Sequence, residues 1–449
     1  MTPILSKAKI PPGPKLPKIV AGYIVMLNHM RALRWLQRRY GDAFKVQIPF
    51  MGPTIVLSRP DYIKQMFLGK PDVLIAGDNN LGKTLGPGSL FSLDRDEHLR
   101  ERRLLLPPFH GERMRSYEVI IEEEARREMA TWRDGAQFAT LPSFMRITLH
   151  AILRAVFGAI GPNGQKLADL IPRLVEVGSL VTLLPILKKD LGPRSPGGRF
   201  NRYRADYDRI INAMIDDAVA DPQRKERVDV MALLLRAKYD DGSTMSRSAI
   251  ADELLTLLVA GHETTATSLA WTVERLTRNP SIVARLKKEA MTDEKDLRLA
   301  TINEVQRTRP VIHAVDRLVT ADEFPLGEWR IPRGYRLLAC ATLIHNDKRF
   351  FERPEVFDPD RFLVRAPDTY TWIPFGGGTR RCIGAAFAQM EMNVVLRTLL
   401  REFDLEITAR PGEAIRSRGV ALAPAQGGRA VVRRPRRTIP SPGLDAGIP

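Results

Sequence analysis

The sequence predicts a mainly helical fold with small β-sheets near both ends. Nearly every segment from about residue 94 to residue 290 has the apolar spacing of helices. Runs of β-branched and apolar residues bounded by turn residues occur outside that stretch, at 42–60 and 315–343. One helical pattern, over 246–279, contains no proline and stands out by its length.

The first 92 residues combine both kinds of element. The prolines of 11–17 fix φ and exclude helix there. Helical patterns follow at 29–40 and 60–69. Between them, 42–60 resembles a hairpin with a Gly-Pro turn between two β-branched runs. The glycines spread through 71–92 predict a loop.

The long helical pattern runs from Ser246 to Asn279 and is stopped by Pro280. Its 34 residues would span about 50 Å, enough to cross a whole domain. The apolar flanks indicate burial, yet the centre holds Gly261 and Thr264, which disfavour helix. Taken alone, the pattern favours helix packing through small residues. The alternative is a functional site, because departures from local rules inside a buried helix accompany function.

The composition is that of an ordinary globular protein, with 44% hydrophobic and 27% charged residues. At 449 residues, two domains or one large domain are equally admissible. No stretch approaches the roughly 20 apolar residues that span a bilayer. The apolar run 19–27 is short and follows prolines, so we expect no secretory signal. Cys340 and Cys382 form neither a disulfide framework nor a zinc pattern, which favours a reducing, cytoplasmic location.

The chain is strongly basic, with 69 Lys and Arg against 52 Asp and Glu and a formal net charge of +17. At the end of the chain, arginines and prolines without apolar periodicity predict a disordered tail over 435–449. The remaining excess of positive charge forms either a solvated basic surface or a docking face for an acidic partner. Charge alone would allow nucleic-acid binding, but no zinc finger or RNA-binding motif accompanies it, so we expect none.

A glycine-rich loop with one of the two cysteines, FGGGTRRCIG at 375–384, precedes a strongly helical stretch. Such a loop could cradle a phosphate or present a thiolate to a metal. A phosphate-binding loop would end in Lys followed by Ser or Thr, and that pair is missing here. The pattern F-x-x-G-x-R-x-C-x-G is met in full by Phe375, Gly378, Arg380, Cys382 and Gly384.

This pattern resembles the haem-binding loop of cytochrome P450, the family of haem-thiolate monooxygenases. Four other segments match family motifs in family order: HLRER at 98–102, AGHETT at 260–265, EVQR at 304–307 and FDPDRF at 357–362. One departure is Gln306, which stands where the family often has leucine. The resemblance covers about Pro11 to Arg434. It implies the cytochrome P450 fold, a single discoid haem domain over 11–434 with a long central helix.

The resemblance also implies haem b, iron protoporphyrin IX, with Cys382 as the axial ligand of the iron. The helix that follows would stabilise the thiolate, and a thiolate ligand favours cleavage of the O–O bond. A buried, inert thiol is the commonest fate of a free cysteine, and we expect it for Cys340, which lacks any motif. For Cys382, the complete motif favours the role of iron ligand over that of an inert thiol.

The same resemblance implies that several other residues contact the haem. His98 and Arg102 are four residues apart on one helix face, and we expect them to bind a haem propionate together with Arg380 and Arg317. Glycines would let the backbone approach the porphyrin closely. The remaining positions expected to contact the haem are Phe375, Gly376, Ala260, Gly261 and Gly384.

The resemblance assigns oxygen chemistry to the long helix. Thr264 is the expected catalytic hydroxyl, in a helix loosened by Gly261, and Glu263 is placed to relay protons from solvent. His262 is expected to pack away from the site. A buried ion-pair triad is implied for Glu304, Arg307 and Arg361, which would hold the ligand loop in place.

These residues imply a monooxygenase that uses O2 and two electrons. Because the haem domain occupies the chain, no flavin domain fits, and electrons would come from a separate ferredoxin or flavodoxin. An acidic partner would suit the basic residues near the propionate helix, namely Arg100, Arg103, Arg113 and Arg115. Two alternatives stay open. One is a peroxide-driven enzyme, although such members typically lack the acid–threonine pair. The other is a haem-binding sensor or carrier without turnover.

The substrate pocket would be surrounded by 72–92, about 165–190, the helix near Ala260, and 311–316. The second of these segments is apolar almost all round, so only part of it can be core. We therefore expect a lipophilic substrate such as a fatty acid, a terpenoid or a sterol. The proline-rich start and AGHETT resemble the microsomal-like branch. No membrane anchor precedes the prolines, and peripheral membrane contact stays open.

Overall fold

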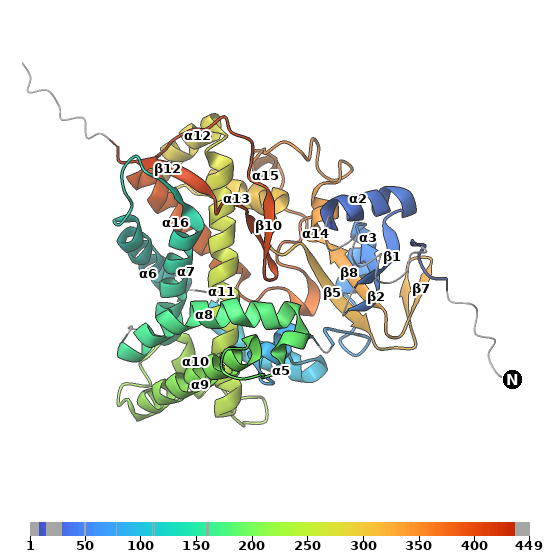
Figure 1. Cartoon of the computed structure of the whole chain (residues 1–449), viewed down its shortest axis with the longest axis horizontal. Coiled ribbons are helices and arrows are strands. Elements are labelled where there is room, and N and C mark those ends of the chain that lie inside the picture. Colours follow the sequence, from blue (N-terminus) through green and yellow to red (C-terminus); the bar gives the residue numbers. More distant parts are fainter. Residues whose placement is uncertain are drawn as a thin grey trace, which may run out of the picture.

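The computed structural model describes residues 9–14, 29–48, 51–77, 79–109, 111, 113–158 and 161–435. Figure 1 shows a large helical part on the left and a smaller part on the right that contains the main β-sheet. The predicted tail over 435–449 lies outside the described residues except for Pro435, and so does the apolar run 19–27.

The sheet part confirms the predicted hairpin near the start of the chain, but the predicted Gly-Pro turn is wrong, because Gly52 and Pro53 lie in the second strand and pair with Ile48 and Gln47. Strands β1 (Ala43–Ile48) and β2 (Gly52–Leu57) pair antiparallel, with Ala43 opposite Leu57. The hairpin extends into a five-stranded sheet of order β1-β2-β8-β5-β3. Its remaining strands are β3 (Leu74–Ile75), β5 (Ala314–Val319) and β8 (Arg336–Cys340). Helices α2 (His29–Tyr40) and α3 (Pro60–Phe67) lie against this sheet, and β6 (Glu323–Leu326) pairs with β7 (Trp329–Pro332).

The helical part confirms the predicted run of helices. Its helices are α5 (Arg95–Leu105), α6 (Arg113–Met129), α7 (Thr140–Phe157), α8 (Pro162–Leu183), α9 (Pro196–Ala220), α10 (Val230–Arg236), α11 (Arg247–Leu276), α12 (Pro280–Ala290), α13 (Asp296–Thr308) and α16 (Ala385–Glu402). Of two short helices, α14 (Ala341–His345) contacts α13 as well as α2 and β5, and α15 (Arg361–Val364) packs against α13. The predicted architecture, mainly helical with small sheets near both ends, is therefore correct.

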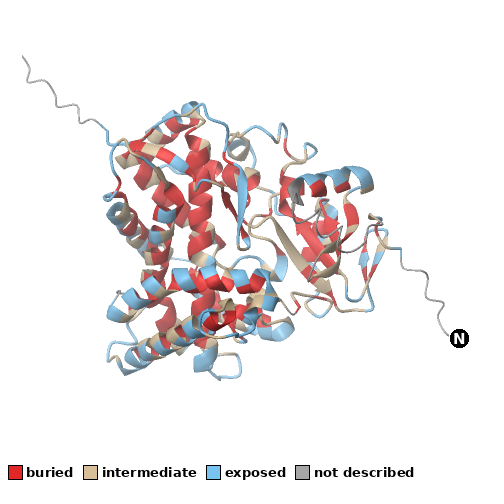
Figure 2. Cartoon of the chain, in the orientation of Figure 1, coloured by how far each residue is buried: buried red, intermediate tan, exposed pale blue. Residues whose placement is uncertain are grey.

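Helix α11 is the long central helix, and it is shorter than the pattern predicted. It has 30 residues, which is about 45 Å. Ser246 caps it by accepting a hydrogen bond from the backbone N–H of Ala249 at 3.1 Å. The helix ends at Leu276, because the next residues turn to start α12 at Pro280. Figure 2 shows α11 buried over most of its length in the middle of the helical part.

Two further features differ from the predicted elements. The segment 71–92, predicted as a loop, contains strand β3 and the short helix α4 (Asn80–Leu85). Asn79 caps α4 by accepting a hydrogen bond from the N–H of Gly82 at 2.7 Å, a local signal that the glycines obscured. Small sheets also form near the C-terminal end, from β4 (Gln137–Ala139), β9 (Asp404–Leu405), β10 (Ile415–Arg418), β11 (Ala421–Pro424) and β12 (Arg429–Arg433).

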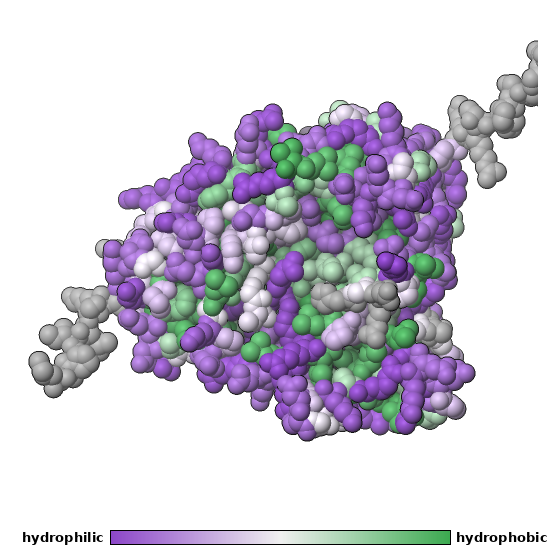
Figure 3. Space-filling model, turned by 180° about the vertical axis from the view of Figure 1, so that it is seen from behind, coloured by the Kyte–Doolittle hydropathy of each residue, from purple (hydrophilic) through white to green (hydrophobic). Residues whose placement is uncertain are grey.

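The apolar side chains gather into two main clusters. The larger joins α7, α11 and α16 with the helices around them, and the smaller lies between the main sheet and α3. Figure 3 shows the rear face as mostly hydrophilic, with hydrophobic side chains in scattered groups. Over the part of the chain that the structure describes, no helix is long and apolar enough to cross a membrane.

Candidate functional site

The cysteine loop 375–384 is closed by its own backbone. The N–H of Cys382 donates to the carbonyl of Phe375 at 2.9 Å, and the N–H of Arg381 donates to that of Gly378 at 3.1 Å. Gly376 and Gly378 adopt φ of 65° and 66°, a conformation that side-chain-bearing residues rarely take. The Phe375 ring packs edge-on against Trp372 with centroids 6.0 Å apart. The motif glycines therefore shape a turn that leads Cys382 to the start of α16.

The glycines of this loop serve two different contacts. A Cβ at Gly377 would overlap the Phe67 ring, and one at Gly378 would overlap the Phe67 carbonyl. These two glycines let the loop lie directly against α3. At Gly384, by contrast, nothing lies within 4 Å of a Cβ, and at Gly376 a Cβ would meet only Val315 at 3.5 Å.

Cys382 is exposed, whereas Cys340 is fully buried in β8. Surrounding protein raises the pKa of the Cys382 thiol; the N–H of Gly384 and the charges of Arg102 and Arg381 oppose that rise. Because the net shift is upward, the helix start does not by itself give a thiolate here. A coordinating metal deprotonates a thiol outright. Burial raises the pKa of Cys340 to about 11, as expected of an inert core thiol.

Four predicted cofactor contacts come together from three segments. His98 and Arg102 lie on α5, Arg317 lies on β5, and Arg380 lies in the cysteine loop. His98 is buried, and burial together with the charges of Arg380, Arg102 and Arg317 lowers its pKa to about 3. Burial and the charge of Arg380 lower the pKa of Arg317 to about 10. The structure thus assembles the cationic cluster that the sequence predicted.

This cluster has too few anions among the residues that the structure describes. Arg380 pairs with Asp94, while Arg317 donates only to the carbonyls of Asp316 at 2.6 Å and Gly377 at 3.4 Å. Among the described residues, the side chains of His98 and Arg102 form no hydrogen bond. Buried cations without counter-charges are costly, so the cluster is suited to a ligand that brings carboxylates. The two propionates of a haem fit that requirement, next to the one exposed thiol.

The middle of α11 is accessible where its flanks are not. Ala260 is exposed and Gly261 and Thr264 are half-buried, between buried residues on both sides along the helix. The Thr264 hydroxyl donates to the carbonyl of Ala260 at 2.8 Å. Helix α11 runs without a break through Gly261. A Cβ at Gly261 would make ordinary contact with Ile152 of α7 at 3.5 Å.

Glu263 is buried and bound to a residue that sequence reasoning missed. Its carboxylate accepts a hydrogen bond from Nε of Arg418, on strand β10, at 2.8 Å. Burial raises the pKa of Glu263, and Arg418 opposes that rise. The two residues are 155 positions apart, so no local pattern could have paired them. The His262 ring nitrogen Nδ1 lies 3.0 Å from the carbonyl of Leu258 in a buried position.

The predicted ion-pair triad is formed. Arg307 donates two hydrogen bonds of 2.7 Å to Glu304, and Nε of Arg361 lies 3.2 Å from the same carboxylate. Arg307 also donates to the carbonyls of His345 at 2.7 Å and Pro354 at 2.9 Å. The triad therefore joins α13 to α14 and to the chain before α15.

Gln306, which departs from the family pattern, also ties helices together. Its side-chain oxygen accepts a hydrogen bond from Gln389 of α16 at 2.9 Å. Trp372, whose ring packs on Phe375, donates to the carbonyl of Asn303 on the same helix α13 at 3.1 Å. Helix α13 is thus connected both to the helix after Cys382 and to the start of the cysteine loop.

The arginines expected to dock a partner are not equivalent. Arg100 pairs with Asp241 at 2.6 Å and Arg103 pairs with Asp240 at 2.9 Å, so neither offers a free charge. Arg115 and Arg381 are exposed and have no ion pair within the described part of the chain. The side chain of Arg113 lies outside the described residues.

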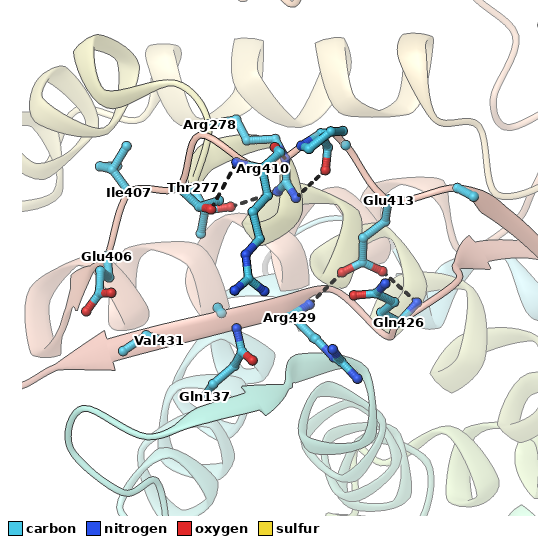
Figure 4. Close-up of a pocket in the computed structure, with 15 residues that line it drawn as sticks. Gln137, Thr277, Arg278, Glu406, Ile407, Arg410, Glu413, Gln426, Arg429 and Val431 are labelled. Carbon is cyan, nitrogen blue, oxygen red and sulfur yellow. Dashed lines mark hydrogen bonds between the residues drawn. The ribbon is translucent and has the colours of Figure 1, made fainter.

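A separate pocket of about 490 Å³ lies at the far end of α11. Figure 4 shows it between Thr277, the loop that carries Arg410, and strand β12 with Arg429 and Val431. None of the predicted site residues lines it. The pocket is therefore not the functional site that the motifs define.

Comparison with known proteins agrees with this geometry. The family model described as Cytochrome P450 matches residues 11–427. A Mycobacterium tuberculosis protein named as cytochrome P450 138 is 50% identical over 426 residues, covering 95% of this chain and 97% of that protein. Another from the same organism, named as cytochrome P450 135B1, is 38% identical over 440 residues, covering 96% and 93%. A solved structure of retinoic acid bound cyanobacterial CYP120A1 matches the fold with a TM-score of 0.82 at 23% identity, covering 96% of this chain and 100% of that one.

Proposed function

Because the chain belongs to the cytochrome P450 family and is a haem-thiolate monooxygenase, we propose that it inserts one oxygen atom of O2 into a lipophilic small molecule, with electrons from a separate partner protein. The observation that carries the proposal is the cluster of the buried His98 and Arg317 with the half-buried Arg102, which lacks counter-charges among the described residues, beside the single exposed cysteine.

The residue roles follow from this arrangement. When bound, the haem supplies O2 binding and electron transfer at a thiolate-ligated iron. Cys382 is the proposed ligand. Arg102, Arg317, Arg380 and His98 would hold the propionates through charge-assisted hydrogen bonds, with Arg380 shared between the cofactor and Asp94.

The accessible middle of α11 would carry the proton chemistry. The Thr264 hydroxyl, which donates to Ala260, can instead donate a proton toward the cofactor side, because Ala260 and Gly261 leave that side open. Glu263 would exchange protons with solvent. We place Phe375, Gly376 and Gly384 next to the cofactor, with Gly384 free of protein atoms on its Cβ side.

A lipophilic substrate is supported by helix α8 and the turn after it. Leu174, Val177 and Val181 of α8 are buried, while Leu183 and Ile186 are exposed although apolar. The structural neighbour CYP120A1 was solved with retinoic acid bound, which is a lipophilic ligand of that protein. We propose a fatty acid, a terpenoid or a sterol for this chain.

For the electron donor we propose a small ferredoxin or flavodoxin in the cytoplasm. The net charge of +17 favours an acidic partner, and the unpaired Arg115 and Arg381 are better placed to meet it than the paired Arg100 and Arg103. A peroxide-driven reaction is disfavoured because both Glu263 and Thr264 are present. A sensor or carrier without turnover would give no product when reductant and partner are both supplied.

The ligand assignment is tested by the absorption of the reduced protein under carbon monoxide. We expect the red-shifted Soret band of thiolate ligation in the native protein, its loss in Cys382→Ala, and its retention in the matched control Cys340→Ala. A Cys382→Ala protein that binds haem and keeps the band would disprove the assignment. Shifts of the haem band on adding fatty acids, terpenoids or sterols would then identify the substrate class.

A further inference from the structure

The proposed proton-relay acid has a single partner in the described part of the chain. The carboxylate of Glu263 is 11% exposed and bonds to Arg418 at 2.8 Å, while the Arg418 side chain is 52% exposed. Arg418 therefore contacts a buried acid at one end and solvent at the other. No other ion pair or hydrogen bond reaches the Glu263 side chain within the described residues.

We propose that Arg418 is the positioning residue of Glu263, and that the β10–β11 hairpin forms the solvent side of the proton path to Thr264. The inference rests on the proposed function, because Glu263 is the acid assigned there. It adds a second structural element to a relay that the sequence places on α11 alone.

Contacts with α8 and α11 hold the β10–β11 hairpin beside Glu263. Strand β10 pairs with β11 in a two-residue turn, with Arg418 opposite Ala421 and Gly419 at φ of 58°. A Cβ at Gly419 would lie 2.8 Å from the Ser179 hydroxyl, so the turn rests on α8. Strand β11 lies along α11. Arg418 is therefore fixed between the helix that carries Glu263 and the helix expected to cover the substrate.

The electrostatics give Arg418 a specific effect on the acid. Among the described residues, Arg418 is the one charged group that acts on Glu263, from any packed element. The neighbouring His262 stays neutral, because burial lowers its pKa to about 4. Without Arg418, burial alone would act on Glu263 and keep its carboxyl protonated to higher pH. The pair therefore favours the carboxylate form of Glu263 against the effect of burial.

The ion pair between Arg418 and Glu263 also sets the direction in which the Glu263 carboxylate points. Successive helix residues diverge by about 100°, so Glu263 points to the hairpin while Thr264 faces another side. A relay would then need the carboxylate to leave Arg418 and accept a proton from solvent hydronium beside the half-exposed guanidinium, which leaves water. The same carboxyl oxygen would then release that proton to the Thr264 hydroxyl oxygen as this hydroxyl gives up its own proton. Only O–H bonds form and break in this exchange, and no electrons move.

The test compares Arg418→Gln with Arg416→Gln. Arg416 lies two residues earlier on β10, on the same strand face, is exposed, and its side chain forms no hydrogen bond or ion pair among the residues described. We expect Arg418→Gln to move the pH profile of coupling, the product formed per electron, upward by about one unit. Arg418→Lys should restore the native profile, and Arg416→Gln should keep it. Substrate affinity, read from the haem band, should stay unchanged in all three.

A second measurement needs no turnover. In the haem-free protein, a higher Glu263 pKa makes the folded state bind its proton more tightly than the unfolded state. Stability of Arg418→Gln should then fall as pH rises from 5 to 8, more steeply than that of Arg416→Gln. Adding Glu263→Gln to Arg418→Gln should remove this extra slope. Equal slopes for Arg418→Gln and Arg416→Gln, or a slope that survives Glu263→Gln, would overturn the proposal.

Failure of the proposed function gives a different result. If Thr264→Ala leaves coupling unchanged, the oxygen chemistry assigned to α11 is wrong, whatever Arg418 does. If Thr264→Ala releases more hydrogen peroxide per electron while Arg418→Gln keeps the native pH profile, the relay stands and the positioning role of Arg418 is refuted.

Discussion

Two groups of buried and half-buried arginines in this protein differ in how their charge is balanced. Around Glu304, the guanidinium groups of Arg307 and Arg361 share a fully buried carboxylate and several backbone carbonyls. Around His98, the guanidinium groups of Arg102 and Arg317 meet no carboxylate among the described residues, and Arg380 meets only Asp94. Both groups match family motifs, and only the second is left with uncompensated charge.

The difference separates residues that hold the fold from residues that hold a ligand. A complete buried ion pair contributes its stabilisation in every state of the folded protein. An incomplete one costs stability until an anion arrives, so the protein gains most when that anion binds. Removing one member should therefore have opposite effects in the two groups.

The largest effect is expected in the balanced group. Glu304→Gln leaves the buried Arg307 guanidinium without a counter-charge and Arg361 with only Asp358 at 3.9 Å, and we expect a loss of about 3–5 kcal/mol in the free energy of unfolding. The loss should appear with and without haem in denaturant titrations. Glu294→Gln, at an exposed position on the preceding turn, should change stability little. A loss seen only with haem bound would place the triad with the ligand-holding group.

In the unbalanced group, we expect Arg317→Gln to weaken haem binding by about 10- to 100-fold, since it removes one charged hydrogen bond to a propionate. The haem-free protein should be no less stable than the native chain, because a buried unpaired charge is lost. The control is Arg336→Gln on the adjacent strand β8, where Arg336 pairs with Asp316. It should destabilise the haem-free protein. The comparison would be contradicted if Arg317→Gln destabilised the haem-free protein in unfolding curves while leaving haem binding unchanged in titrations.

The pH dependence of the free energy of unfolding tests the missing counter-charges around His98. In the haem-free chain its pKa is lowered to about 3, against an ordinary value of 6.5. The unfolded chain therefore binds the proton more readily, and stability should fall as pH drops from 6.5 toward 3. His262 and His345 have the same sign, so His98→Gln should remove only part of this acid slope. Bound haem should reduce the His98 share, because propionates offset the three arginines. An acid slope that His98→Gln leaves intact would exclude this source.

The smallest effect concerns the surface, where arginines are again paired or unpaired. Reversing the unpaired Arg381 or Arg115 to Glu should slow reduction by an acidic partner at low salt, and the difference should fade as ionic strength rises. Reversing Arg100 or Arg103 should do less, because Asp241 and Asp240 already neutralise them. Stopped-flow reduction rates that respond equally to all four reversals would show that pairing within the chain does not matter for docking.

The sequence was sufficient for the motifs whose members are close along the chain. The 375–384 loop, the α13 motif and the long helix were all recognised from local spacing, and periodicity located most helices. Two kinds of feature could not be predicted. The cap that Asn79 gives α4 was hidden among glycines, and the use of Gly377 and Gly378 against Phe67 needs the three-dimensional fold.

Long-range partners were the other limit. The bond from Arg418 to Glu263 and the pairing of Arg100 with Asp241 join residues more than 100 positions apart. Charge counting treats such arginines as free, because it has no information on which carboxylates lie beside them. The partners that the structure adds to the relay acid and to the docking arginines could not be predicted for this common reason.

The contrast between the two cysteines also provides a way to count protein molecules that lack cofactor. Cys340 is fully buried and its thiol has a pKa of about 11, so an alkylating reagent should not modify it in the folded state. Cys382 is exposed, and we expect it to react until iron occupies its sulfur. Mass spectrometry after brief alkylation should then show at most one label per chain. The labelled fraction would report directly how much of a preparation is still without haem.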